Sequence, residues 1–136
     1  MITMKSIQSV YGETTESELL TTGRFTVSGD SFCISYEDSD ATGFKGSITK
    51  ILVKRDSKYA SVTRTGSASS VLIMETEKKH HCQYGTPYGT MDIGIYTHFI
   101  KNSLDKNGGE LHMKYTMDMN SSYVSDNEII VYVKKS

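Results

Sequence analysis

Leu111-His112-Met113-Lys114-Tyr115-Thr116-Met117-Asp118-Met119 is the stretch of sequence that decides the fold class. Its odd-numbered positions are apolar or aromatic, and its even-numbered positions are polar. Successive side chains of an extended strand point to opposite faces, so this alternation predicts a strand with one buried face.

The same period of two recurs along most of the chain. Odd-numbered positions face inward in residues 91–99, and Leu19, Phe25 and Val27 lead another inward row. Gly23 lies inside that second row, which predicts a bend or a close backbone approach there. Further strand-like segments cover residues 2–10, 32–36, 48–54, 59–64, 71–75, 79–84 and 127–133. No segment has the pattern of a helix of ordinary length, so the sequence predicts about ten strands joined by short turns.

Strands with one apolar face each must bury those faces together, in a sandwich or in a barrel. The connections resemble successive hairpins, and a barrel removes the exposed edges that long strands would otherwise present. We therefore predict an all-β, antiparallel, closed barrel of about 8–10 strands, in a single domain over residues 1–136.

The hairpin between residues 91–99 and 111–119 is constrained by parity. Residues that pair across two antiparallel strands share a face, so two odd-numbered inward rows require an even sum of paired residue numbers. A two-residue turn at Asn107-Gly108 gives an odd sum. A loop of three or five residues near 105–109, or a β-bulge, is therefore expected.

Composition excludes several classes of function. The net charge is −1, 37% of residues are hydrophobic and 23% are charged, which is typical of a globular domain without general affinity for nucleic acid or anionic membranes. No apolar run approaches the roughly 20 residues that span a bilayer, and no secretory signal is recognised. Cys33 and Cys82 are expected to be separate thiols. These features favour a cytoplasmic protein.

Metal binding and catalysis have little support. His80 and Cys82 could share a face of one strand, but zinc needs two more ligands. His98 and His112, on outward rows of paired strands, could complete such a site or could simply be exposed. No nucleophile motif is present, and the acidic segment 37–40 lacks the distal carboxylate of a calcium loop, so we interpret it as solvated. We predict no metal, no cofactor and no catalytic residues, so the protein is not expected to be an enzyme.

The candidate binding residues lie on the inward rows. Arg64 would face one end of the barrel, where its planar guanidinium could bind a ligand carboxylate or could act as a structural plug. Tyr36 and Tyr115 would supply polar groups, and Met113 and Met117 would line an adaptable apolar pocket or simply form core. A barrel of this size can be filled or can hold one small ligand.

Five stretches occur in this order along the chain: Thr21-Thr22-Gly23-Arg24-Phe25, Ile34-Ser35-Tyr36-Glu37, Val62-Thr63-Arg64-Thr65-Gly66, Tyr84-Gly85-Thr86-Pro87-Tyr88-Gly89 and Gly108-Gly109-Glu110-Leu111-His112-Met113-Lys114-Tyr115. Together they resemble the YwiB-like family of small bacterial proteins. The resemblance covers nearly the whole chain and implies a calycin-like, that is lipocalin-like, barrel of unknown function. We expect a barrel that binds a small apolar or amphipathic ligand; the alternative is a protein-interaction or structural module with a filled core, and a homodimer is compatible with both.

Overall fold

A computed structural model describes residues 1–38, 45–66, 69–86, 89–119 and 121–134. These residues form eleven strands and no helix, so the all-β prediction is confirmed and the strand count exceeds the predicted range by one. The strands are β1 (Ile2–Val10), β2 (Glu13–Thr21), β3 (Arg24–Ser28), β4 (Ser31–Glu37), β5 (Ser47–Lys54), β6 (Tyr59–Gly66), β7 (Ser70–Glu75), β8 (Lys79–Thr86), β9 (Gly89–Asn102), β10 (Gly108–Met119) and β11 (Ser122–Lys134).

All eleven strands belong to one sheet, in the order β2-β1-β11-β10-β9-β8-β7-β6-β5-β4-β3. Every pair of neighbouring strands is antiparallel, as predicted. The two ends of the sheet, β2 and β3, are consecutive in the chain but do not pair with each other. The prediction of a closed barrel is therefore wrong at one place, which we call the seam between β2 and β3.

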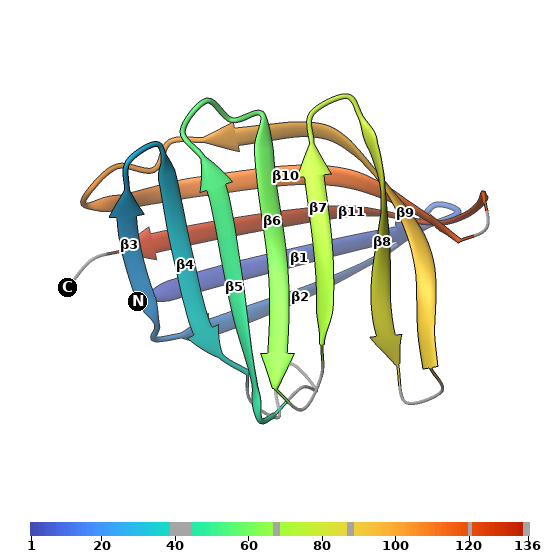
Figure 1. The fold of residues 1–136 in the computed structure, drawn as a ribbon, viewed down its shortest axis with the longest axis horizontal. Coiled ribbons are helices and arrows are strands. Elements are labelled where there is room, and N and C mark those ends of the chain that lie inside the picture. The colour runs from blue at the N-terminus through green and yellow to red at the C-terminus, as the bar shows by residue number, and fades with distance from the viewer. Residues whose placement is uncertain (39–44, 67–68, 87–88, 120, 135–136) are drawn as a thin grey trace.

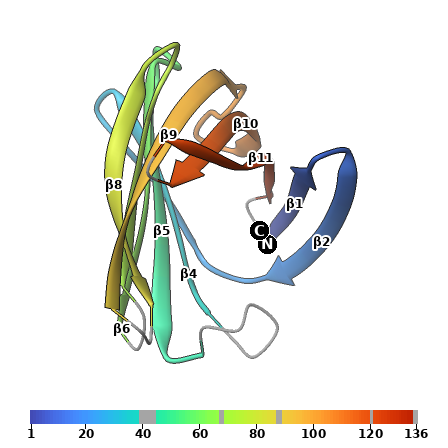
Figure 2. The ribbon, with the colours of Figure 1, turned by 90° about the vertical axis from the view of Figure 1, so that its right-hand side faces the viewer.

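The sheet folds over on itself into two layers. Figure 1 shows β3 to β8 side by side, crosswise to β10, β11, β1 and β2 behind them. β9 starts beside β8 in the first layer and bends over into the second (Figure 1). In Figure 2, β1 and β2 lie on the opposite side of the molecule from β5, β6 and β8. The inward faces of the two layers together enclose the core.

A β-bulge at His98 lets β9 belong to both layers. Leu111 pairs with Asn102, but Tyr115 pairs with Thr97, so the sum of paired residue numbers changes from odd to even between these pairs. The inward side chain consequently shifts from Thr97 to Ile100. This shift supplies the parity change that the sequence required, and bulges commonly allow a strand to turn such a corner.

Two details of that hairpin differ from the prediction. The turn has only two residues between the paired Asp105 and Gly108, so the odd-length loop is not used. Phe99 is not on the inward row, because the bulge precedes it and its place in the core is taken by Ile100.

Thr22 and Gly23 form the second corner, where β2 ends and β3 begins (Figure 1). Gly23 fits there because a Cβ at this position would collide with the Ser35 carbonyl and the Ile2 side chain. The close backbone approach predicted for Gly23 is thus confirmed. At this corner the chain passes from one layer to the other, so β2 and β3 belong to different layers. Of the predicted inward row, Leu19 and Phe25 pack against the core, but Val27 is 40% exposed, which contradicts the prediction.

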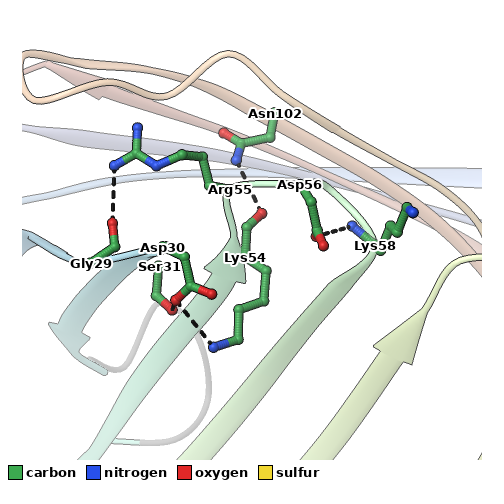
Figure 3. A network of polar contacts seen from close by, with 8 residues as sticks. All are labelled: Gly29, Asp30, Ser31, Lys54, Arg55, Asp56, Lys58 and Asn102. Atoms are coloured by element: carbon green, nitrogen blue, oxygen red, sulfur yellow. Dashed lines mark hydrogen bonds and ion pairs between the residues drawn. The ribbon is translucent and has the colours of Figure 1, made fainter.

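One end of the interior is tightly packed. Fully buried side chains fill it from both layers: Ile2, Phe32, Val53, Ala60, Met74, Ile95, Leu111, Met113 and Val131. Figure 3 shows polar contacts of the turns that follow β3 and β5. Arg55 donates to the Gly29 carbonyl at 3.2 Å, and Asn102 of β9 donates to the Lys54 carbonyl at 3.5 Å, which joins the two layers.

Candidate functional site

The other end of the interior holds a cavity of about 440 Å³. Each inward row that starts in the packed end continues to this cavity; on β10, for example, Met113 is fully buried and Met117 lines the cavity. Of the described residues that line it, nine are apolar and seven carry a hydroxyl, amide or guanidinium group. They are Met4, Ser6, Gln8, Tyr36, Thr49, Ile51, Val62, Arg64, Ser70, Leu72, Met91, Ile93, Tyr115, Met117, Met119 and Ile129.

A buried polar cluster lies at the side of this cavity that faces the seam. The Thr49 hydroxyl donates to Oδ2 of Asp38 at 2.7 Å, and Nε of Arg64 donates to Oγ1 of Thr49 at 3.1 Å. Nε of Arg64 lies 3.4 Å from the same Asp38 oxygen. The Asp38 side chain is 0% exposed and that of Arg64 is 17% exposed, so this is an ion pair largely removed from water.

Tyr36 completes the cluster. Its hydroxyl donates to Sδ of Met4 at 3.6 Å. Burial raises the pKa of Tyr36 above its usual value, and the negative charge of Asp38 raises it further, although hydrogen bonds with Thr49 and Arg64 act in the opposite direction. The phenol is therefore neutral at physiological pH and can donate a proton in a hydrogen bond.

The seam opens toward this cluster. A groove of about 720 Å³ follows the corner between β2 and β3 and reaches Tyr36, Asp38 and Ile48. A smaller hollow of about 230 Å³ lies between β2 and the cluster and is lined by both Tyr36 and Arg64. Tyr36 borders all three spaces, so it stands between the interior cavity and the surface at the seam.

Four of the five predicted binding residues line the cavity: Arg64, Tyr36, Tyr115 and Met117. The fifth, Met113, is on the same inward row but lies in the packed end. Whether these residues bind a ligand stays a prediction. What the structure adds is that they are brought together at one end of the interior by β4, β6 and β10.

Two residues of the cluster are missing from the sequence prediction, Asp38 and Thr49. The interpretation of Asp38 as part of a solvated acidic loop is wrong, because its side chain is fully buried. Ser39 and Asp40 lie outside the described residues. The signal was present in the alternation, since Asp38 continues the inward row of Phe32, Ile34 and Tyr36. Thr49 likewise continues the odd-numbered row of β5.

The histidines and cysteines do not converge. His80 hydrogen-bonds to Glu75, His112 to Glu128, and His98 to Thr116, so these three histidines have separate partners. Both cysteines are free thiols, and Sγ of Cys82 accepts a hydrogen bond from the Ile73 amide at 3.3 Å. In the described part of the chain, no three of the His, Cys, Asp and Glu side chains are grouped as metal ligands.

His98 belongs to a second polar network, on the outer face. The Thr116 hydroxyl, next to His98, donates to Asp126 at 2.7 Å, and the Tyr123 hydroxyl donates to the other Asp126 oxygen at 2.9 Å. The Thr116 hydrogen bond is the main cause that lowers the pKa of Asp126. This network connects β9, β10 and β11, and none of its members lines the cavity.

Comparison with known proteins agrees with the resemblance seen in the sequence. Residues 2–131 match the family described as "Domain of unknown function (DUF1934)". The chain is also similar to the crystal structure of the ywiB protein from Bacillus subtilis, with 20% sequence identity and a TM-score of 0.74 over 98% of this chain and 90% of that one. No curated protein matches the chain. Within the described residues, no helix could cross a membrane.

Proposed function

Because this chain belongs to the DUF1934 family, whose function is unknown, we propose a function from its cavity: the protein binds one small amphipathic molecule between the two layers of its sheet. The apolar part of the molecule would lie among the methionine and aliphatic side chains. Its polar group would lie at the Tyr36–Arg64 cluster, beside the seam.

The cavity is the observation that carries this proposal. Its volume of about 440 Å³ falls in the range of small-molecule sites, which are concave, mostly apolar and equipped with a few polar groups. Methionine side chains are flexible and polarisable, so Met91, Met117 and Met119 can adapt to the shape of a ligand. The alternative, an interaction module, assumes a filled core, whereas this end of the interior holds a cavity.

Binding can be measured with N-phenyl-1-naphthylamine, an uncharged apolar dye whose fluorescence rises in an apolar site. We expect saturable binding of one dye per chain. Native mass spectrometry of the protein purified from its own source should also report a bound small molecule. If the dye does not bind the folded protein, the proposal is overturned.

Two adjacent residues of β7 provide a matched pair of variants. Leu72 lines the cavity, whereas Val71 is on the outer face and 44% exposed. Leu72→Trp should fill the cavity and weaken dye binding at least tenfold, and Val71→Trp should leave it unchanged. If Leu72→Trp does not fold, Ser70→Trp places the same bulk at the rim of the cavity. Unchanged dye affinity in the folded cavity variant would contradict the proposal.

A further inference from the structure

The charge on the cavity wall is already matched by an opposite charge. Among the described residues that line the cavity, Arg64 is the only charged one. Its Nε lies 3.4 Å from Oδ2 of Asp38, which is fully buried and borders the groove at the seam. Thr49 joins the two, since its hydroxyl donates to Asp38 at 2.7 Å and accepts from Arg64 at 3.1 Å. Arg64 and Asp38 each make a further interaction as well, so the ion pair is occupied from within the protein.

An ion that enters such a cavity loses its hydration and gains no counter-charge. Removing an isolated carboxylate or ammonium group from water is far more costly than removing a hydroxyl that finds a hydrogen-bond partner. Only the small fraction of a carboxylic acid that is protonated at neutral pH, or of an amine that is deprotonated, can enter uncharged. The described wall therefore disfavours charged head groups of either sign.

Uncharged polar side chains are present on β1 beside the ion pair. Ser6 and Gln8 are two residues apart on the inward row of this strand, and both line the cavity. Within the described part of the chain, no hydrogen bond of either side chain is found. Ser6 is half-buried and also borders the hollow that Tyr36 and Arg64 line, so a head group at Ser6 lies beside the polar cluster.

We propose that the molecule bound in the cavity is an uncharged amphipathic compound with a hydroxyl or amide head group. The head group hydrogen-bonds to Ser6 and Gln8, and the apolar part lies among Met117, Ile93 and Leu72. A hydroxyl or an amide fits this place because it can donate and accept, as the side chains of serine and glutamine can. This proposal rests on the proposed function and names the class of ligand for the same cavity.

Three probes with the same chain length and different head groups test the proposal: 1-decanol, decanoate and decylamine, each displacing N-phenyl-1-naphthylamine at neutral pH. We expect decanol to bind at least tenfold more tightly than either ion. Decanoate or decylamine that binds as tightly as decanol overturns the proposal, and so does a bound dye that decanol does not displace. Absence of dye binding would instead overturn the proposed function itself.

Lysine variants show whether the wall sets this preference, because decanol is the most apolar probe and would be favoured by any apolar surface. Met119 lines the cavity, whereas Val71 lies on the outer face. Met119→Lys adds an unmatched cation to the wall and should raise the affinity for decanoate relative to decanol at least tenfold. Met119→Gln, which adds no charge, and Val71→Lys, which adds the charge outside, should leave the ratio unchanged.

An unchanged ratio in folded Met119→Lys overturns the proposal, because the charge of the wall would then not select the ligand. An equal change in Val71→Lys overturns it as well, since the preference would reflect the charge of the whole protein. If Met119→Lys does not fold, Ser70→Lys places the same cation at the rim of the cavity.

The place of the head group is tested by removing single hydroxyl groups from β1. Ser6→Ala should weaken decanol binding about fivefold, the loss expected for one hydrogen bond, and should leave dye binding unchanged. Ser9→Ala is the matched control and should change neither affinity, because the Ser9 hydroxyl bonds to Thr14 and Ser9 is not among the residues that line the cavity. Unchanged decanol affinity in both Ser6→Ala and Gln8→Leu overturns the proposed binding of the head group on β1.

Discussion

At the scale of single residues, the buried hydroxyl of Thr97 is the clearest feature that lowers the stability of the fold. It is fully buried on β9, beside the bulge at His98, and its Oγ1 has no hydrogen-bond partner among the described residues. An unsatisfied buried hydroxyl costs about 1–3 kcal/mol, which a methyl group of similar size avoids. We expect Thr97→Val to raise the free energy of unfolding by about 1 kcal/mol, measured by urea denaturation.

Thr97→Ser is the control for this prediction. It keeps the hydroxyl and removes a methyl group from the core, so its free energy of unfolding should fall by about 1 kcal/mol. A Thr97→Val variant that is less stable than the unchanged protein would show that the hydroxyl has a partner, and the prediction would then be wrong.

At the scale of the elements, the corner between β2 and β3 decides whether the ring of strands closes. The two strands are joined by Thr22 and Gly23 alone and leave the corner in different layers (Figure 1). An alanine at position 23 would place its Cβ against the Ser35 carbonyl and 2.7 Å from Cδ1 of Ile2. Because the contact is with the backbone carbonyl of Ser35 in β4, it can be relieved only by moving the corner.

We therefore expect Gly23→Ala to lower the free energy of unfolding by about 1–3 kcal/mol, the range of overpacked sites. Thermal unfolding followed by circular dichroism would measure the effect. Thr22→Ala, one residue earlier and exposed, should change stability by less than about 0.5 kcal/mol. Equal effects of the two substitutions would mean that the close approach at Gly23 does not restrain the corner.

At the scale of the whole molecule, the interior is divided into a packed end and a hollow end. Met113 and Met117 lie on the same row of β10, with Met113 fully buried and Met117 on the cavity wall. We expect Met113→Ala to lower the free energy of unfolding by about 2–5 kcal/mol, because it opens a new void in close-packed core. Met117→Ala only enlarges an existing space and should cost about 1 kcal/mol.

Chemical denaturation of both variants tests this division, since the two substitutions remove the same atoms. Similar losses of stability would show that the interior is packed equally at both positions. That result would also remove the cavity on which ligand binding depends, so the pair of variants checks the whole-molecule architecture independently of any ligand.

The sequence by itself determined the local features of this protein. Alternation predicted the strands, the inward rows and the antiparallel hairpins, because successive side chains of a strand point to opposite faces, independently of the rest of the chain. It also predicted the close approach at Gly23 and the need for a change of parity between β9 and β10, and it selected Arg64, Tyr36, Tyr115 and Met117 as candidate binding residues.

Only the tertiary structure decided how those rows are used. Met113 and Met117 have the same place in the pattern, but Met113 lies in the packed core and Met117 lines the cavity. Asp38 and Arg64 are 26 positions apart, and their pairing follows from the register of β4, β5 and β6. Periodicity reports only which face a side chain occupies, whereas curvature, the open seam and the buried ion pair depend on contacts between distant segments.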